Sequence, residues 1–115
     1  MAHLSTSIKA GSLLFLSGRL AFDSDGKIIG DIEKQTLLIL EQHFDELSKH
    51  NLRPENVVKA GVWLTERHDF QSFDSAYAQA FGDHRPARAT VISQLAIQGA
   101  LIEIDLVASF DSIVG

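Results

Sequence analysis

The segment from residue 102 to residue 110 limits the possible folds more than any other part of the chain, because its side chains alternate between two faces. The even positions are apolar: Ile102, Ile104, Leu106, Ala108 and Phe110. The odd positions carry Glu103, Asp105, Val107 and Ser109. A period of two is typical of a β-strand with one face against a core. The even face therefore needs a covering layer, which we expect helices to provide.

Two segments have the periodicity of amphipathic helices. Asp31 is a candidate N-cap for a helix running to about His50, with the apolar stripe Leu37, Leu40, Phe44 and Leu47. Asp69 is a candidate N-cap for a second helix, which ends near Gly82 and has the stripe Phe70, Phe73, Tyr77 and Phe81. Such stripes are typical of helices packed on a core.

Four more segments are predicted to be strands, because they are rich in strand-forming residues and bounded by turns: residues 5–10, 13–20, 57–65 and 87–93. The element order is then ββαβαββ. Right-handed crossovers place both helices on one face of a single mixed sheet, which gives an α+β fold. The 115 residues, 45% of them hydrophobic, fit one domain spanning residues 1–115.

The alternation also predicts which side chains lie opposite the helices. In the last strand this set includes Glu103. In the fourth strand the small residues Ala87, Ala89 and Val91 are the better core set, which sends Arg88 and Thr90 to the helix-free side. Other side chains expected there are Phe15, Ser17, Trp63 and Val107. This mixture is too apolar to face water, so we expect partner subunits of the same chain to cover it.

Arg88 and Glu103 form the candidate catalytic pair. A guanidinium holds a carboxylate through two parallel hydrogen bonds, whereas an ammonium offers only a point charge. An ionised glutamate can orient a water molecule toward an electrophilic carbon beside that carboxylate. The pair suits addition of water to the C=N bond of a small acid. Isolated Arg and Glu residues on strands more often have structural or solvated roles, so an ordinary interface ion pair remains an alternative.

Composition argues against other kinds of chemistry. The chain has no cysteine, and its five histidines lack the spacing of a metal site, so we expect neither a metal nor a cofactor. His43 and His50 are expected to be partly exposed. The net charge of -5 and the scattered basic residues disfavour nucleic-acid binding. The apolar stretch from Leu13 to Leu16 is too short for a signal peptide or a membrane span, which favours a cytoplasmic protein.

Several short motifs occur along the chain in this order: Leu16-Ser17-Gly18, Val57-Val58-Lys59, Asp69-Phe70 with Tyr77 and Phe81, Pro86-Ala87-Arg88, and Ile102-Glu103-Ile104. Together they resemble the RidA/YjgF-type reactive intermediate deaminase family, also named L-PSP endoribonucleases or translation inhibitors. The resemblance implies a chorismate mutase-like domain that assembles as a homotrimer, with pockets between subunits. It also implies hydrolysis of small enamines and imines carrying a carboxylate, such as 2-aminoacrylate, to 2-oxo acids and ammonia without any cofactor.

The same resemblance assigns roles to individual residues. Arg88 matches the arginine that holds the substrate carboxylate, and Glu103 matches the glutamate that positions the attacking water. Ser17 and Gly18 match a Ser-Gly segment near the pocket. Independently of the family, Gly18 is expected to allow a strand bulge or a close backbone approach.

Four pocket positions depart from the family pattern. Leu4 replaces a tyrosine, Arg19 a glutamine, Asp74 an asparagine and Thr90 a cysteine. These changes bear on the identity of the substrate more than on the type of reaction. Two alternatives therefore stay open. One is a non-catalytic sensor of small carboxylates, in which Asp74 repels an anion or pairs with Arg19. The other is RNA cleavage or translation inhibition, which the acidic charge opposes.

Overall fold

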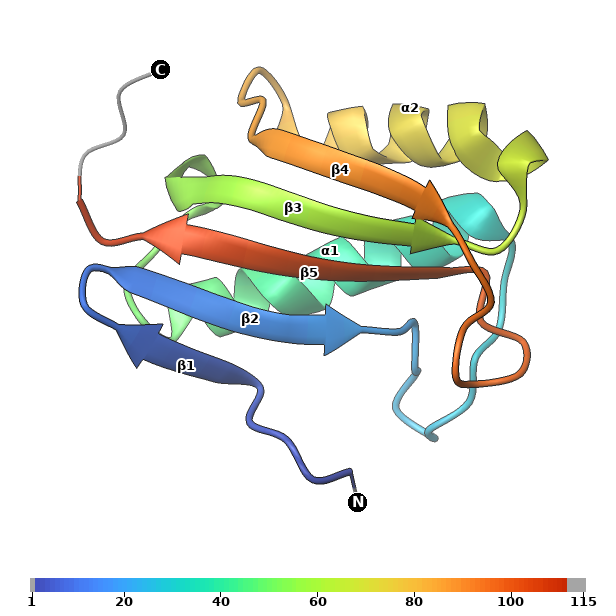
Figure 1. Cartoon of the computed structure of the whole chain (residues 1–115), viewed down its shortest axis with the longest axis horizontal. Coiled ribbons are helices and arrows are strands. Elements are labelled where there is room, and N and C mark those ends of the chain that lie inside the picture. The colour runs from blue at the N-terminus through green and yellow to red at the C-terminus, as the bar shows by residue number, and fades with distance from the viewer. Residues whose placement is uncertain (1, 112–115) are drawn as a thin grey trace.

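A sheet of five strands with two helices on one of its faces forms the protein (Figure 1). The computed structural model describes residues 2–111. The strands are β1 (Ser7–Ala10), β2 (Leu13–Arg19), β3 (Val57–Leu64), β4 (Ala87–Ile92) and β5 (Ile102–Ser109). The helices are α1 (Ile32–Ser48) and α2 (Phe70–Phe81), and short 3-10 turns span Pro54–Asn56 and Arg67–Asp69. The predicted ββαβαββ order is confirmed.

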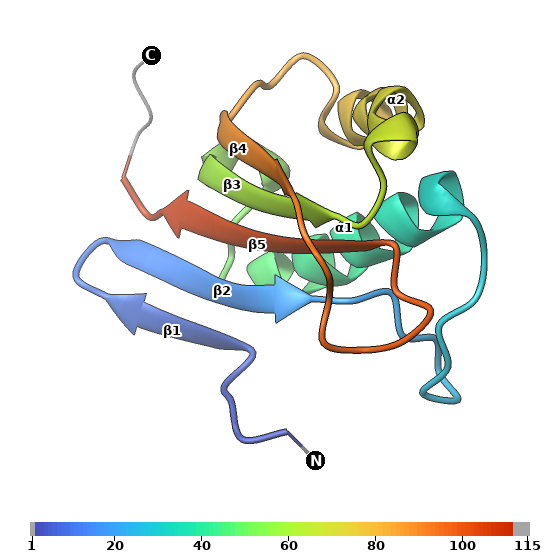
Figure 2. The same ribbon diagram turned by 45° about the vertical axis from the view of Figure 1, so that its right-hand side comes forward.

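The order of the strands in the sheet is β1-β2-β5-β3-β4, so β1 and β4 are its edges. Strand β5 is antiparallel to both of its neighbours, whereas β3 and β4 are parallel because α2 crosses over between them. The sheet is mixed, as predicted. Figure 2 shows both helices behind the same face, with α2 near the β4 edge. The opposite face carries Phe15, Trp63, Glu103 and Val107, and we call it the helix-free face.

The core lies between the sheet and the helices. The even-numbered residues of β5 are all buried there: Ile102, Ile104, Leu106 and Ala108. They pair across the sheet with residues of β2 and β3 that are buried on the same side, such as Leu16 and Val62. The alternation in β5 therefore predicted the covered face correctly.

Helix α1 begins as expected but buries a somewhat different stripe. The Asp31 carboxylate accepts a hydrogen bond from the backbone N–H of Lys34 at 2.9 Å, which caps the helix. Leu40 and Leu47 are buried as predicted, but Leu37 and Phe44 are only partly covered. The ring of Phe44 lies edge-on against Phe81, with centroids 5.2 Å apart, so it serves the contact between the two helices.

Helix α2 ends at Gly82, whose φ of 67° suits a residue without a side chain. Its start differs from the prediction. The chain enters α2 through a 3-10 turn, and Asp69 already has a helical conformation with φ of -83° and ψ of -4°. Its side chain therefore makes no capping hydrogen bond. In the predicted stripe Phe73, Tyr77 and Phe81 are buried, whereas Phe70 is exposed.

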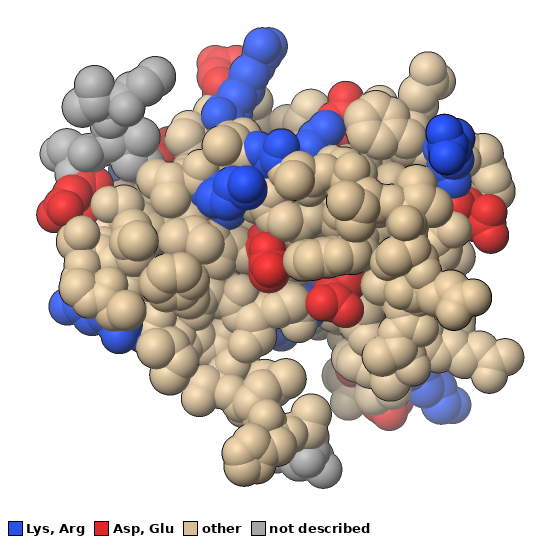
Figure 3. Space-filling model, viewed as in Figure 1, with Lys and Arg blue, Asp and Glu red and all other residues tan. Residues whose placement is uncertain are grey.

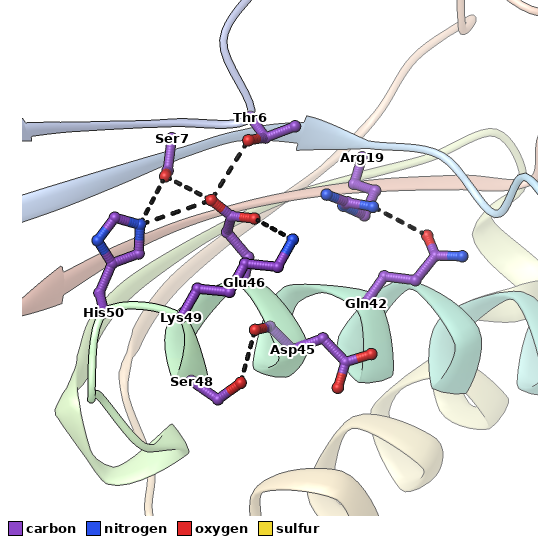
Figure 4. A network of polar contacts seen from close by, with 9 residues as sticks. All are labelled: Thr6, Ser7, Arg19, Gln42, Asp45, Glu46, Ser48, Lys49 and His50. Carbon is purple, nitrogen blue, oxygen red and sulfur yellow. Dashed lines mark hydrogen bonds and ion pairs between the residues drawn. The ribbon is translucent and has the colours of Figure 1, made fainter.

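A polar network fixes the edge strand β1 to α1 (Figure 4). Its centre is the buried carboxylate of Glu46, which accepts hydrogen bonds from Ser7 Oγ at 2.7 Å and from Thr6 Oγ1 at 3.3 Å. Lys49 Nζ lies 3.5 Å and His50 Nε2 lies 3.6 Å from this carboxylate. The Ser7 hydrogen bond is the main cause that lowers the pKa of Glu46, against the effect of burial. His50 is partly exposed, as predicted.

The prediction for His43 is wrong, because this residue is buried between α1 and the sheet. Its Nε2 donates a hydrogen bond to the carbonyl of Ile104 at 2.7 Å, and its Nδ1 has no partner within residues 2–111. Burial lowers the pKa of His43 to about 4, so the ring is neutral near pH 7.

In the part of the chain that the structure describes, neither helix has the length and apolar character needed to span a membrane.

Candidate functional site

Arg88 lies on the edge strand β4 and points toward α2. Its parallel partner in β3 is Ala60, which is fully buried on the helix side. The Arg88 Nη1 donates a hydrogen bond to Asp74 Oδ1 at 2.8 Å, and its Cζ lies 4.8 Å from the centre of the Tyr77 ring and 5.0 Å from that of Phe73. The guanidinium is thus held between an α2 carboxylate and α2 aromatic faces.

The predicted placement of Arg88 and Thr90 on the helix-free face is therefore wrong. Thr90 pairs with the buried Val62 and shares the helix side with Arg88. The small residues of β4, Ala87 and Ala89, are exposed instead. At this edge of the sheet α2 covers only part of the strand, and the long Arg88 stem with its flat head fills that space better than a methyl group.

A cavity of about 600 Å³ opens beside Arg88. It is lined by Asp74, Tyr77, Ala78, Phe81, Gly82, His84, Arg85, Pro86 and Arg88. The His84 ring is fixed by a hydrogen bond from its Nε2 to the Val57 carbonyl at 2.7 Å. Burial raises the pKa of Tyr77 to about 12 despite the opposing charge of Arg88, so its phenol stays protonated. The cavity lining also carries the guanidinium groups of Arg85 and Arg88 and the carboxylate of Asp74.

Glu103 lies on the helix-free face, next to Gly18. A Cβ atom at Gly18 would overlap the Glu103 carboxyl group, so the carboxyl occupies the space that any other residue would fill. Strand β2 also bulges at this point, because Leu16 pairs with Leu106 while Arg19 pairs with Ile104. The close approach and the bulge expected at Gly18 are both confirmed.

A second carboxylate lies beside Glu103 in the same way. Asp105 accepts a hydrogen bond from the Gly61 N–H at 3.0 Å, and its carboxyl fills the space of the missing Gly61 side chain. Burial raises the pKa of Glu103, and the charge of Asp105 raises it further. Burial also raises the pKa of Asp105, although the Gly61 hydrogen bond and Lys59 act against this. Figure 3 shows acidic groups near the middle of a largely uncharged face.

Asp105 is a residue of this site that was not predicted from the sequence. The available signal was its spacing of two from Glu103 in one strand, which places both carboxylates on one face.

One chain does not bring Arg88 and Glu103 together. Strand β3 lies between their strands, and Glu103 pairs with Trp63, which pairs in turn with Val91. With a strand spacing of about 4.8 Å, β5 and β4 are about 10 Å apart. The two side chains also leave the sheet on opposite faces.

The remaining predicted site residues lie in different places. Ser17 donates a hydrogen bond from its Oγ to the Ser5 carbonyl and so holds the segment that contains the exposed Leu4. Arg19 is on the helix side, where its Nη1 donates to Gln42 Oε1 at 3.2 Å (Figure 4). Of the two possibilities considered for Asp74 in a sensor, pairing with Arg19 does not occur in this structure, because Asp74 binds Arg88 and Arg19 binds Gln42. Within residues 2–111 no group of three or more His, Asp or Glu side chains is arranged to hold a metal ion.

The comparisons with known proteins decide the family. A sequence profile described as Endoribonuclease L-PSP matches residues 1–110. The chain belongs to the RidA/YjgF/L-PSP family. A RutC family protein of Pyrococcus horikoshii is 36% identical over 106 residues, which cover 90% of this chain and 84% of the relative. The Schizosaccharomyces pombe protein named mmf2, mitochondrial, is 32% identical over the same shares of both chains. A cytoplasmic location therefore stays a prediction for this member of the RidA/YjgF/L-PSP family.

Solved structures of the RidA/YjgF/L-PSP family have the same fold. Yeast Mmf1 is 27% identical with a TM-score of 0.89, covering 96% of this chain and 90% of Mmf1. The structure of E. coli TdcF with bound serine is 25% identical with a TM-score of 0.88, covering 95% of this chain and 89% of TdcF. The family resemblance and the predicted fold class are confirmed.

Proposed function

We propose that the protein hydrolyses small enamines and imines that carry a carboxylate, giving 2-oxo acids and ammonia, in pockets between the subunits of a homotrimer. Each pocket takes Arg88 from one subunit and Glu103 from its neighbour. The observation that carries the proposal is the pair of half-sites in one chain: a guanidinium at the cavity on the β4 edge and a carboxyl group seated over Gly18 on the helix-free face. Membership of the RidA/YjgF/L-PSP family supports the type of reaction.

The helix-free face supports the assembly. Phe15 and Val91 are 44% and 45% exposed on it, and Trp63 is half-buried between Val91 and Glu103. Large apolar side chains exposed on one face favour burial by another copy of the chain. A copy that covers this face can bring its β4 edge, with Arg88, toward Glu103 of the first.

The chemistry follows from the two groups. Arg88 holds the carboxylate of the substrate, and Glu103 accepts a proton from a water molecule whose oxygen attacks the carbon of the protonated C=N group. The C=N electron pair moves to nitrogen. Glu103 then returns the proton to that nitrogen. As the C–N bond breaks and ammonia leaves, the hydroxyl group forms the C=O of the 2-oxo acid and Glu103 accepts the hydroxyl proton. The raised pKa of Glu103 suits a group that takes up and returns one proton.

The bound ligand of one relative agrees with a small amino-acid-like guest. The TdcF structure holds serine, which has a carboxylate beside a nitrogen. In this chain a similar molecule would place its carboxylate against Arg88. The cavity of about 600 Å³ is large enough for a guest of this size.

A continuous assay tests the activity. An amino-acid oxidase generates the imine of alanine in the presence of semicarbazide, which competes with hydrolysis by trapping the free imine. We expect the protein to lower the amount of trapped imine and to raise pyruvate release. Arg88→Ala should reduce this effect at least tenfold. Arg67→Ala, at an exposed arginine of the 3-10 turn, is the matched control and should keep full activity. Full activity of Arg88→Ala excludes the proposed role of Arg88.

A second candidate function is a non-catalytic sensor of small carboxylates. The observation in its favour is the ion pair of Arg88 with Asp74, which a substrate carboxylate has to share or displace. Calorimetric binding of a small carboxylate by a protein that accelerates no imine hydrolysis supports the sensor, and measurable turnover excludes it.

A further inference from the structure

Asp74 places a negative charge beside the Arg88 guanidinium, where Arg88 would bind its guest. The Arg88 side chain is 21% exposed, whereas the Asp74 side chain is 50% exposed and stands at the open side of the pair. Apart from the hydrogen bond to Asp74, the Arg88 guanidinium donates to no other group within residues 2–111. Its remaining N–H groups can therefore bind a guest that approaches past the Asp74 carboxylate.

The cavity lining carries charged side chains of both signs. Arg85 and Arg88 supply positive charge, and Asp74 supplies the negative charge directly beside Arg88. Arg85 is exposed and forms no ion pair in the described part of the chain. A carboxylate on Arg88 therefore has a like charge as its nearest neighbour, unless the guest itself carries a positive group there.

We propose that Asp74 makes this cavity selective for small zwitterions over plain carboxylates, with the guest's carboxylate on Arg88 and its cationic nitrogen against Asp74. The inference rests on the proposed function, because it concerns the same Arg88 site. It assigns Asp74 as a residue that determines specificity. The Asp74 Oδ1 lies 2.8 Å from the Arg88 Nη1.

The proposed selectivity favours the substrate of the reaction over its product. A protonated imine that carries a carboxylate is a zwitterion, whereas the 2-oxo acid product is a plain anion. Asp74 then stabilises the bound substrate in its protonated, electrophilic form and weakens the binding of the product. A structural role of Asp74, in which it only orients the Arg88 side chain, would affect both kinds of guest alike.

A matched pair of ligands separates these possibilities. L-Alanine and propionate share a carbon skeleton and differ in the charged nitrogen, and calorimetry or NMR titration at constant ionic strength gives the affinity of each. We expect wild-type protein to bind L-alanine about tenfold more tightly than propionate, which corresponds to about 1.4 kcal/mol. In Asp74→Asn propionate should bind about tenfold more tightly than in wild type, and the preference for L-alanine should disappear.

The control is Asp83→Asn, which removes the same charge from an exposed residue of the loop between α2 and β4 that does not line the cavity. It should leave the preference unchanged. An unchanged preference in Asp74→Asn overturns the inference, and if imine hydrolysis persists the proposed function still stands. Absence of binding by both ligands, in wild type and Asp74→Asn alike, overturns the carboxylate site itself. Melting followed by circular dichroism confirms that each variant is folded.

Discussion

Burial of a neutral His43 should make the folded protein less stable in mild acid, because the unfolded chain there takes up a proton that the folded protein does not. The ring is 1% exposed, and its Nε2 donates to the Ile104 carbonyl at 2.7 Å. Burial is the main cause that lowers the pKa of His43 from 6.5 to about 4. The Ile104 hydrogen bond raises this pKa, the charge of Arg19 lowers it, and Glu46 raises it.

The direction of the change in stability with pH follows from the pKa values of His43 in the unfolded and folded chain. As the pH falls through 6.5, the histidine of the unfolded chain takes up a proton, whereas the buried ring stays neutral until about pH 4. The contribution of the neutral ring to stability is therefore complete above pH 6.5 and is lost progressively as the pH falls toward 4. Linkage gives a loss of about 2 kcal/mol between pH 7 and pH 5 for these values. Total stabilities of about 5 to 15 kcal/mol make this loss easy to detect.

Urea unfolding at pH 7, 6 and 5, at one fixed protein concentration, measures the effect. The test variant is His43→Gln, whose side-chain amide keeps a donor for the Ile104 carbonyl but does not titrate. Wild type should lose about 2 kcal/mol more than His43→Gln between pH 7 and pH 5. His68→Gln, which removes an exposed histidine, should follow wild type. Parallel pH profiles of wild type and His43→Gln would refute the reasoning.

Three further substitutions test the site and the β1 network. Gly18→Ala should abolish imine hydrolysis while changing the free energy of unfolding by less than about 1 kcal/mol, because the new methyl group displaces the Glu103 carboxyl without backbone strain. The matched variant Gly61→Ala displaces Asp105 instead and should keep most of the activity; equal rates in both would contradict this. Glu46→Gln should lower stability by about 1 to 2 kcal/mol at pH 7, since it removes the charge that accepts the Ser7 hydrogen bond. The lowered pKa of Glu46 means that this stabilisation is present above pH 4.5 and lost as the pH falls below it, so an equal deficit at pH 7 and pH 3 in urea unfolding would argue against it.

The elements of the fold were predictable because their signals are local. The alternation in β5 and the helical stripe of α2 each identify one element and its buried face. The bulge at Gly18 was also predictable, since a glycine in a strand marks a place where the ladder is interrupted or another group approaches.

The face of β4 was not predictable from its own residues. It depends on the register with β3, which pairs Arg88 with the buried Ala60. At a sheet edge, small apolar residues are not a reliable sign of the core, because the helix layer covers the edge incompletely. The ion pair of Arg88 with Asp74 likewise forms only once α2 has packed beside β4.

The buried state of His43 was missed for a different reason. A search for apolar stripes skips a histidine, although the ring can be buried when a carbonyl such as that of Ile104 accepts its N–H. Its pKa and its burial are properties of the packed sheet and helix rather than of α1 alone.

The claim that each active site needs two copies of the chain is tested most directly by mixing two inactive variants. Arg88→Ala retains Glu103, and Glu103→Gln retains Arg88, so a site between an intact Arg88 of one subunit and an intact Glu103 of another is restored in mixed oligomers. After joint unfolding and refolding at equal amounts, we expect imine hydrolysis to recover to about a quarter of the wild-type rate, since each site needs one particular variant on each side. A mixture that stays as inactive as its parents, although mass measurement shows mixed oligomers, would contradict the composite site.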